Sequence, residues 1–451
     1  MKQSVTLRRL TQFATVTAIA LALVAVLAPV QAQDEISGEV NVMGFGTGDE
    51  IATERVDLFR ETYPNVEVSF TEGALDEQQF LTAVASGTPP DAVYIDRALL
   101  STYAVRGALQ PLTQCIEDMG IDMSIFRQAA VEQVTINGEI YGIPDFWNNI
   151  YLMINTAAVE EAGLTLDDIS TTDWDRLTEL NEALTRIENG RVTRIGFDPK
   201  LPEFFPLWVR ANGGQLLSDD GRTAMLNSPE AVEALEYAFS QHEPSGGRAE
   251  FMAFRDTWDF FGSNNQIVAD QVGFWPMEQW YMNVLADVSP DAPIAFKAFT
   301  DREGNPISMA TGSAWAIPTN SANYEGACAL AATMTSTEAW IRAAQKRAEL
   351  RAESGTINTG VSPANAEAEE IIFTEIVGPT GNEVFDQGIA VLREVQEAGF
   401  AIPANPAGNE FRQAWMDAVN RVLNGEQTAQ EALDQAQAEA QAALDSAWSR
   451  Q

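Results

Sequence analysis

The alternation of apolar and polar positions predicts a regular order of strands and helices near the start of the chain. Residues 39–45 place Val40 and Val42 between polar neighbours, which is typical of a strand. Asp49 follows and can cap a helix whose apolar positions recur every three or four residues. A second strand is predicted at 66–70, a second helix at 76–86 and a strand buried on both faces at 92–95. This order indicates a parallel, doubly wound α/β sheet.

The same pattern extends the α/β organisation over the rest of the chain. It predicts strands at 139–144, 150–154 and 308–317 and helices at 172–188 and 229–239. Thr428 and Glu431 form a capping box at the start of the last helix. The polar turn at 301–306 is interpreted as a crossing between two lobes. We therefore predict lobe one from residues 33–144 plus 307–337, and lobe two from residues 145–306 plus 338–451.

The first 32 residues are predicted to be a cleaved signal peptide. Lys2, Arg8 and Arg9 precede an apolar run at 13–27, and Ala32 ends a small-residue cleavage site. The alternative is a signal anchor that stays in the membrane. Because no cysteine follows the apolar run, we expect no lipid anchor. The predicted location is periplasmic or secreted, with no membrane anchor on the mature protein.

Composition and charge narrow the possible functions. The chain has 451 residues, of which 45% are apolar, and carries 65 acidic against 27 basic residues, for a net charge of −38. Nucleic acid is an unsuitable partner because binding phosphates needs a basic face. The acidity fits either a salty medium or plain solubility. His242 is the single histidine and the chain has two cysteines, which argues against a Cys/His metal site and a Ser-His-Asp triad. Cys115 and Cys328 form either one disulfide or two buried thiols.

Six segments, in order, carry a resemblance to a known family. They are FRETYPNVEV at 59–68, the segment 85–111 that begins ASGTPPDAVYID, NGEIYGIPDFWNNIYLMIN at 137–155, NGG at 212–214, GSAWAIPTNSANYEGACALAATMTST at 312–337 and GEQTAQEAL at 425–433. With these, the chain resembles the extracellular solute-binding proteins of ABC importers, of the sugar-binding type typified by maltose-binding protein. The resemblance implies an α/β two-lobe periplasmic-binding-protein fold that closes on its ligand and performs no chemistry. It also implies a carbohydrate ligand, a monomer, no cofactor and the transmembrane subunits of an importer as partners.

Strand ends and the resemblance together nominate the residues that would hold a sugar. Carboxylates and amides bond to sugar hydroxyls, and aromatic rings cover the apolar faces of the sugar. In open α/β sheets, ligands sit at the carboxyl ends of strands. The candidate substrate-binding residues are Asp49, Asp96, Arg97, Trp147, Asn148, Glu203, Phe204, Trp280, Gly312 and Arg412.

Several of these candidates have a structural alternative. Asp49 and Asp96 could instead cap helices. Trp147 could pack in the hinge, and Phe204 and Trp280 could belong to the core. We expect Trp280 and Asp96 to face each other across the cleft, one from each lobe.

Three functions fit this pattern. The leading one is capture of a sugar, most simply an oligosaccharide, for delivery to an ABC transporter. A secreted glycoside hydrolase would also use aromatic rings and carboxylates, although no sequence spacing nominates its pair of carboxylates. A binder of another solute, such as a polyamine, would suit the acidity.

Overall fold

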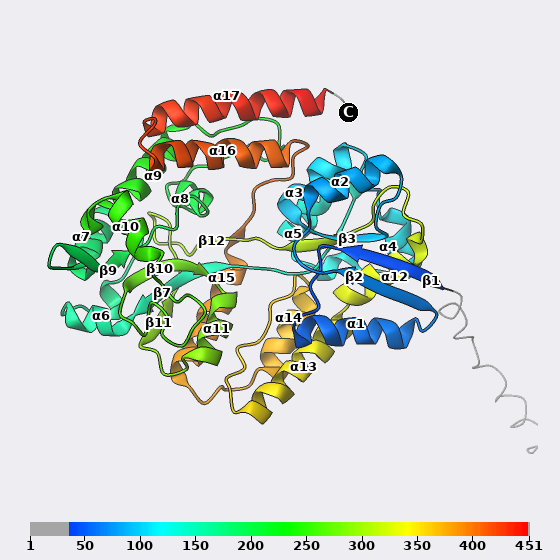
Figure 1. Ribbon diagram of the computed structural model, residues 1–451, viewed down its shortest axis with the longest axis horizontal. Helices are drawn as coiled ribbons and strands as arrows, with labels where there is room; N and C mark the ends of the chain where they lie inside the picture. The colour runs from blue at the N-terminus through cyan, green and yellow to red at the C-terminus, as the bar shows by residue number, and fades with distance from the viewer. Residues whose placement is uncertain (1–35, 450–451) are drawn as a thin grey trace, which may run out of the picture.

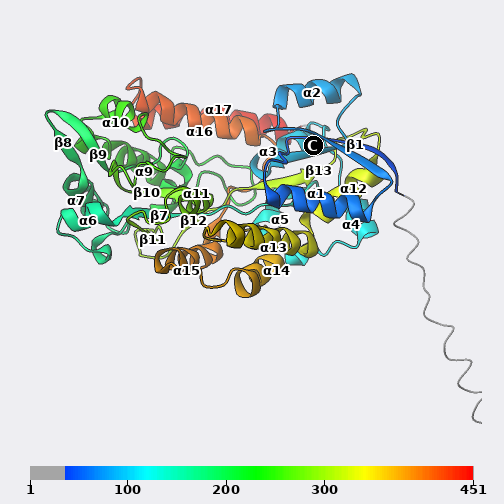
Figure 2. The same cartoon turned by 60° about the horizontal axis from the view of Figure 1, so that its bottom comes forward.

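The chain forms two α/β units that lie side by side, each built on a five-stranded sheet (Figure 1). The computed structural model describes residues 36–449, so the predicted signal peptide lies outside the described residues. Helices α16 and α17 lie together along one edge of the molecule in both ribbon views (Figures 1 and 2).

The first unit contains a mixed sheet with the strand order β2-β1-β3-β13-β6. Its strands are β1 Gly38–Met43, β2 Val66–Thr71, β3 Ala92–Asp96, β6 Ile143–Pro144 and β13 Ser313–Ala316, and a hairpin joins β4 Thr135–Ile136 to β5 Glu139–Ile140. Its helices are α1 Glu50–Thr62, α2 Glu77–Ser86, α3 Arg97–Val105, α4 Thr113–Met119, α5 Gln128–Val134 and α12 Tyr324–Thr335. Strands β1, β2 and β3 are parallel, and β13 runs against β3 and β6.

The second unit contains a mixed sheet with the order β11-β7-β10-β9-β8. Its strands are β7 Ile150–Asn155, β8 Arg186–Glu188, β9 Arg191–Phe197, β10 Val272–Glu278 and β11 Ile294–Lys297. The helices of this part of the chain are α6 Thr156–Glu161, α7 Trp174–Leu184, α8 Phe205–Ala211, α9 Pro229–Ser240, α10 Arg248–Arg255, α11 Trp280–Val288, α15 Glu383–Glu397, α16 Gly408–Leu423 and α17 Ala429–Trp448.

Short sequence patterns predicted several elements correctly. Asp49 caps α1, accepting a hydrogen bond from the Ala52 amide at 2.8 Å. Strand β3 is buried as predicted, with Ala92 and Val93 facing hydrophobic clusters on opposite sides of the sheet. The predicted capping box at Thr428 and Glu431 opens α17. These agreements arise where a short stretch of sequence decides the structure.

Two predicted elements were too long. The helix expected at 172–188 ends at Leu184, and residues 186–188 pair with β9 through a tight turn at Asn189 and Gly190. Both turn residues have positive φ, which is the signature of an Asn-Gly hairpin. The strand expected at 308–317 is two short strands, β12 Ser308–Met309 and β13, because Gly312 interrupts it with φ +148°.

The polar turn at 301–306 lies before the second chain crossing. The turn at 301–306 stays within the second unit, where the Asp301 amide bonds to the Asn305 carbonyl and Thr300 bonds to Thr171. The crossing is the segment that follows it, which includes β12. Helix α13 Thr337–Ser354 lies along α1, with Arg342 paired to Glu54 and Glu61, and α14 Ala366–Ile371 follows it. The proposed division of the chain at residue 338 stays a prediction.

The two cysteines are joined. Cys115 of α4 and Cys328 of α12 form a disulfide within the first unit, with their Cα atoms 5.6 Å apart. Of the two alternatives that the sequence allows, the structure therefore shows the cross-link. It ties together two helices that are 213 residues apart in the chain.

His242 is a buried structural residue of the second unit. Its Nδ1 lies 2.8 Å from the Phe239 carbonyl, and its ring packs edge-on against Phe251. Burial lowers the pKa of His242 from 6.5 to about 4, although the Phe239 carbonyl opposes this shift. The folded protein therefore holds this imidazole in its neutral form over most of the acidic range.

This pKa shift predicts a pH-dependent stability. Because the folded pKa lies below the unfolded one, the contribution of His242 is complete above pH 6.5 and is lost as the pH falls towards 4. The loss should approach about 3 kcal/mol. Denaturant unfolding of the protein and of His242→Gln between pH 7 and 4 measures it. The stability difference between the two proteins should narrow as the pH falls. A constant difference would contradict the assignment.

Candidate ligand-binding site

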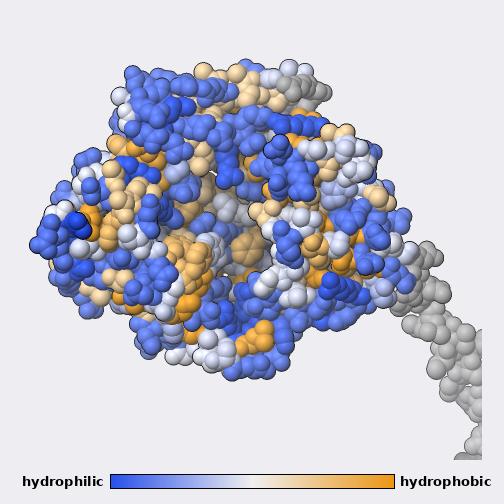
Figure 3. All heavy atoms as spheres, viewed as in Figure 1, coloured by the Kyte–Doolittle hydropathy of each residue, from blue (hydrophilic) through white to orange (hydrophobic). Residues whose placement is uncertain are grey.

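Three segments lie against one another between the two units. Residues 145–149 and 307–312 cross from one unit to the other, and residues 399–405 join α15 to α16. Asn148 and Thr311 exchange backbone hydrogen bonds of 2.9 and 3.0 Å, and β12 pairs in parallel with β14 Gly399–Phe400. Figure 3 shows the surface hollowed between the two units. This hollow is the natural place for a ligand, since both units contribute strand ends to it.

A cavity of about 540 Å³ lies between the units. The first unit contributes Phe45, Asp49 and Tyr94, which follow or belong to the carboxyl ends of β1 and β3. Trp280 and Asn283, on the first turn of α11, come from the second unit. The wall is completed by Trp340 of α13 and the segment 359–362. Aromatic faces and hydrogen-bonding groups thus surround the same space.

A buried ion pair forms the floor of this cavity. The Arg55 guanidinium lies 2.6 Å from the Asp145 carboxylate and 3.8 Å from the centre of the Trp340 ring. It also donates to the carbonyls of Ile51 and Met334. Burial raises the pKa of Asp145, and the charge of Arg55 opposes that rise. Both charged groups are buried and bonded to each other, so the pair has a structural role in the cavity floor. Hydrogen bonds to a ligand would come from the other lining residues.

Tyr94 adds a neutral hydroxyl group to the floor. Burial, and then the neighbouring Asp145, raise the pKa of Tyr94 well above its ordinary value. Its hydroxyl therefore stays protonated and can both donate and accept a hydrogen bond. Asp49, which caps α1, keeps an exposed carboxylate that lies 3.4 Å from Arg347.

A second, smaller cavity of about 120 Å³ lies beside the crossings. Asp96, Arg97, Glu203 and Arg412 are among its lining residues. The Asp96 carboxylate caps α3 through the Ala98 amide and lies 3.5 Å from an Arg412 guanidinium nitrogen. Since Asp96 belongs to the first unit and Arg412 to α16, this contact joins the two sides of the cleft. The structure does not bring Trp280 and Asp96 into one cavity.

Arg97 has a different role from the one expected of it. Its side chain is 1% exposed and donates to the carbonyls of Phe146, Thr311 and Ser313 and to the Gln133 side chain. Burial lowers its pKa to about 10, and Asp96 opposes that shift. The guanidinium is therefore occupied by the two crossing segments, and its bonds stabilise the hinge.

Gly312 is required by this arrangement. A Cβ atom built on it would lie 2.0 Å from the Phe146 carbonyl oxygen and 2.5 Å from the Arg97 guanidinium. No side chain fits in that space. The sequence nominates Gly312 as a substrate-binding residue, and the structure shows it at a close approach of two crossing segments.

Several predicted aromatic residues are buried. Trp147 is 1% exposed and lies between the guanidinium groups of Arg97 and Arg127, at 5.4 and 5.6 Å from its ring. Phe204 is likewise buried in the core of the second unit. Neither has a face open to a ligand in this structure, so each matches its packing alternative. Asn148 is 8% exposed, and its Oδ1 has no hydrogen-bond partner among the described residues.

Other residues at the cleft were missed by sequence reasoning. Asn283 lies one turn beyond Trp280, so helical spacing could have found it. Glu278 ends β10 beside Trp280, and burial raises its pKa while Lys200 opposes that rise. Tyr94 and Asp145 were overlooked because the first looked like a core position and the second like a loop residue.

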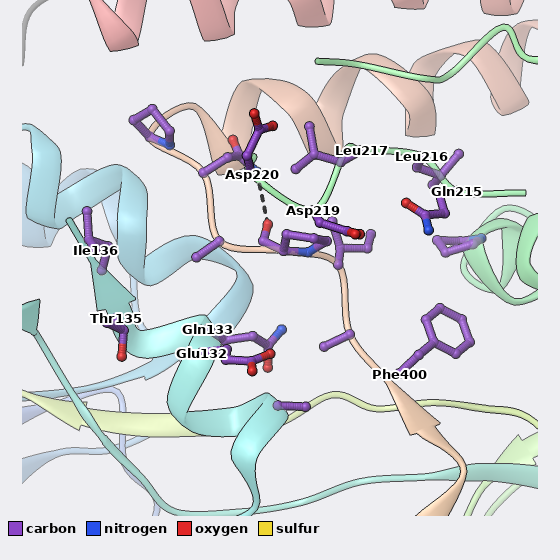
Figure 4. Close-up of a pocket in the computed structure, with 18 of the residues that line it drawn as sticks. Glu132, Gln133, Thr135, Ile136, Gln215, Leu216, Leu217, Asp219, Asp220 and Phe400 are labelled. Atoms are coloured by element: carbon purple, nitrogen blue, oxygen red, sulfur yellow. Dashed lines mark hydrogen bonds between the residues drawn. The ribbon is translucent and has the colours of Figure 1, made fainter. Parts of the chain in front are cut away.

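A third cavity of about 710 Å³ is lined in part by the segment 400–406. Figure 4 shows Glu132 and Gln133 on one side of it, with Gln215, Asp219 and Asp220 opposite. It shares Gln133 and the segment 402–405 with the small cavity. Its size depends on both units, so it too would change if they moved relative to each other.

Two kinds of feature are absent from the described residues. Across residues 36–449 there is no group of three or more histidine, cysteine or acidic residues placed to hold a metal ion. In the same range no helix is both long and apolar enough to cross a membrane.

Comparison with known proteins places the chain in a family. It belongs to the bacterial extracellular solute-binding proteins, whose family model matches residues 46–339. That range contains all of the six resembling segments except the last, so the resemblance stated from the sequence is confirmed.

The chain has low sequence identity to its curated relatives, and each alignment covers only part of both chains. An arabinooligosaccharide-binding protein of Bacillus subtilis (strain 168) is 22% identical over 296 residues, which is 62% of this chain and 65% of the relative. A lactose-binding protein of Rhizobium radiobacter is 26% identical over 165 residues, covering 36% of this chain and 37% of the relative. The chain therefore spans less than two thirds of these relatives. Both are named as binding proteins.

Solved structures confirm the predicted two-lobe α/β fold. CpMnBP1 with mannotriose bound superposes with a TM-score of 0.71 at 22% identity, covering 89% of this chain and 99% of that one. The substrate-binding protein Lmo0181 of Listeria monocytogenes, in complex with cycloalternan, gives 0.71 at 20% identity, covering 91% and 99%. At these identities the likeness establishes the fold.

The close approach at Gly312 predicts a specific cost of substitution. Gly312→Ala should lower the unfolding free energy by about 2–5 kcal/mol, because the added methyl group strains the backbone and displaces the Phe146 carbonyl or Arg97. Gly73→Ala is the matched control, since Gly73 also has positive φ but has open space around it. That control should lose only about 1–2 kcal/mol. Chemical denaturation compares the two. Equal losses would show that the crossings adjust freely.

Proposed function

We propose that this protein captures a neutral sugar, most simply an oligosaccharide, between its two lobes and delivers it to the transmembrane subunits of an ABC importer. The observation that carries the proposal is the 540 Å³ cavity, in which Trp280 of one unit faces a wall that holds Tyr94 and Asp49 of the other. An aromatic ring covers an apolar sugar face, and the hydroxyl and carboxylate bond to sugar hydroxyls. The names of the relatives support a sugar as the ligand.

Lobe closure is the proposed means of capture. Each unit alone presents only half of the polar and aromatic groups. A ligand that contacts both halves binds the closed arrangement more tightly and shifts the population towards it. The crossings at 145–149 and 307–312 are the segments about which the units would turn, and the segment 399–405 lies against them. In this proposal the sugar is released unchanged, and the predicted signal peptide would direct the chain to the periplasm or outside the cell.

The surface charge favours a neutral ligand over an anionic one. With a net charge of −38, the protein repels anions at low salt. Its buried cations are already paired, as Arg55 is with Asp145, or bonded to carbonyls, as Arg97 is. A neutral sugar is not repelled by the negative surface and needs no unpaired cation in the site.

A thermal-shift panel tests this function. At about 100 times its dissociation constant, a ligand of the folded state adds about 2.7 kcal/mol of stability, so the melting temperature should rise with the right sugar. The panel contains mono- and oligosaccharides and, as a separate arm, polyamines. Chromatography of the sugar after incubation should recover it unchanged. Stabilisation by a polyamine and by no sugar would contradict the proposal, and a hydrolysed sugar would indicate the glycoside hydrolase instead.

A further inference from the structure

Phe261 is an exposed aromatic residue whose position the function above leaves unexplained. It is 64% exposed, more than any other large apolar side chain among the described residues. It lies in the loop between α10 and β10. Burying a phenylalanine side chain is worth about 1.5–3 kcal/mol, so leaving it in water forgoes that stabilisation. One exposed apolar residue is ordinary on a protein surface. The significance of Phe261 comes from what lies next to it.

The loop holds Phe261 in place through its neighbours. The adjacent Phe260 ring stacks on Tyr281 at 4.3 Å, and the Tyr281 hydroxyl donates to the Phe260 carbonyl at 2.6 Å. The Asn265 side chain donates to the Gly262 carbonyl at 3.1 Å. Both flanking residues are therefore tied to buried parts of the second unit. The outward position of Phe261 is set by these bonds.

The Phe261 ring lies next to the ring of Trp280. Their centroids are 6.1 Å apart and their planes differ by 17°, a geometry within the range of offset-stacked aromatic pairs. Trp280 lines the 540 Å³ cavity, and Phe261 lies outside it. A ring in the cavity wall thus has a second, nearly parallel aromatic ring beside it outside the cavity.

The chemistry of this pair of rings fits a neutral sugar chain. An oligosaccharide repeats an apolar ring face along its length, so two adjacent aromatic rings match two successive sugar units where one ring matches a single unit. The exposed carboxylates of Asp256 and Asp259 belong to the same loop and disfavour an anionic unit. We propose that Trp280 and Phe261 form a platform for two successive sugar units, which makes Phe261 a determinant of the chain length that the protein prefers. This inference rests on the proposed function.

The test compares Phe261→Ala with two other variants, using calorimetric affinities for a series of increasing chain length built on the sugar that the panel identifies. In the unaltered protein, affinity should rise when the unit that reaches Phe261 is added. Phe261→Ala should lower the affinity for the longer sugar about tenfold, which is the effect of one lost stacking contact. It should leave the affinity for the shorter sugar unchanged. Trp280→Ala should weaken every member of the series. Ile187→Ala removes another exposed apolar side chain of the second unit and should change nothing.

Failure of the two-ring platform can be distinguished from failure of the proposed sugar-binding function. Failure of the unaltered protein to bind any sugar would overturn the proposed function. If the unaltered protein binds a sugar, two results contradict the two-ring platform. Phe261→Ala either lowers the affinities for short and long sugars equally or changes neither. Unchanged sugar affinities with a loss of importer stimulation would reassign Phe261 to a protein contact. The ligand-free melting temperature of Phe261→Ala should match the parent, and Phe261→Tyr should retain the preference for the longer sugar.

Discussion

The hydrogen bonds of Arg97 hold together the segments on which the two-lobed structure depends. Its guanidinium donates to the Phe146 carbonyl of the first crossing, to the Thr311 carbonyl of the second at 2.9 Å and to the carbonyl of Ser313, the first residue of β13, at 3.2 Å. The Thr311 and Ser313 carbonyls also accept backbone hydrogen bonds from Asn148 and Asp145, so Arg97 adds a second donor to each and reinforces the contact between the segments. Gly312 allows the approach because any side chain would collide with Phe146 or with Arg97 itself.

The same crossings also carry part of the cleft. Asp145 begins the first crossing and, paired with Arg55, forms the floor of the 540 Å³ cavity, while Thr311 of the second crossing lines the 120 Å³ cavity. The hinge and the candidate site are thus built from adjacent residues. A change in the angle between the units would alter both cavities together. This coupling is what a protein that captures its ligand by closing would need.

The sequence predicted those parts of the fold that are decided locally. Asp49 and its apolar helix, strand β3 and the capping box at Thr428 each rest on a few adjacent residues. The strands β9, β10 and β11 were not predicted. The first half of β9 carries two arginines and a threonine, and β10 and β11 are short apolar runs without the polar alternation of a half-buried strand. The hairpin turn at Asn189 and Gly190 was a local signal, and the longer helical pattern before it obscured it.

The candidate site was harder to predict because its geometry depends on distant pairs. The nearest carbonyl partner of Arg97 in the chain is Phe146, 49 residues away, and Thr311 is 214 residues away. Nothing near Arg97 in the sequence distinguishes a hinge arginine from one that contacts a ligand. Trp147 looked exposed in a polar segment, yet two arginines cover its ring. The sequence did not nominate Phe261 as a binding residue, because its proposed role depends on its position beside Trp280 in the folded protein.

The central claim is that a sugar draws the two lobes together about these crossings. Small-angle X-ray scattering tests it directly, by comparing the radius of gyration of the protein alone and with a saturating sugar from the panel. The account predicts a smaller radius with the sugar and no change with a sugar that leaves the melting temperature unaltered. An unchanged radius at saturation with a bound sugar would contradict capture by lobe closure.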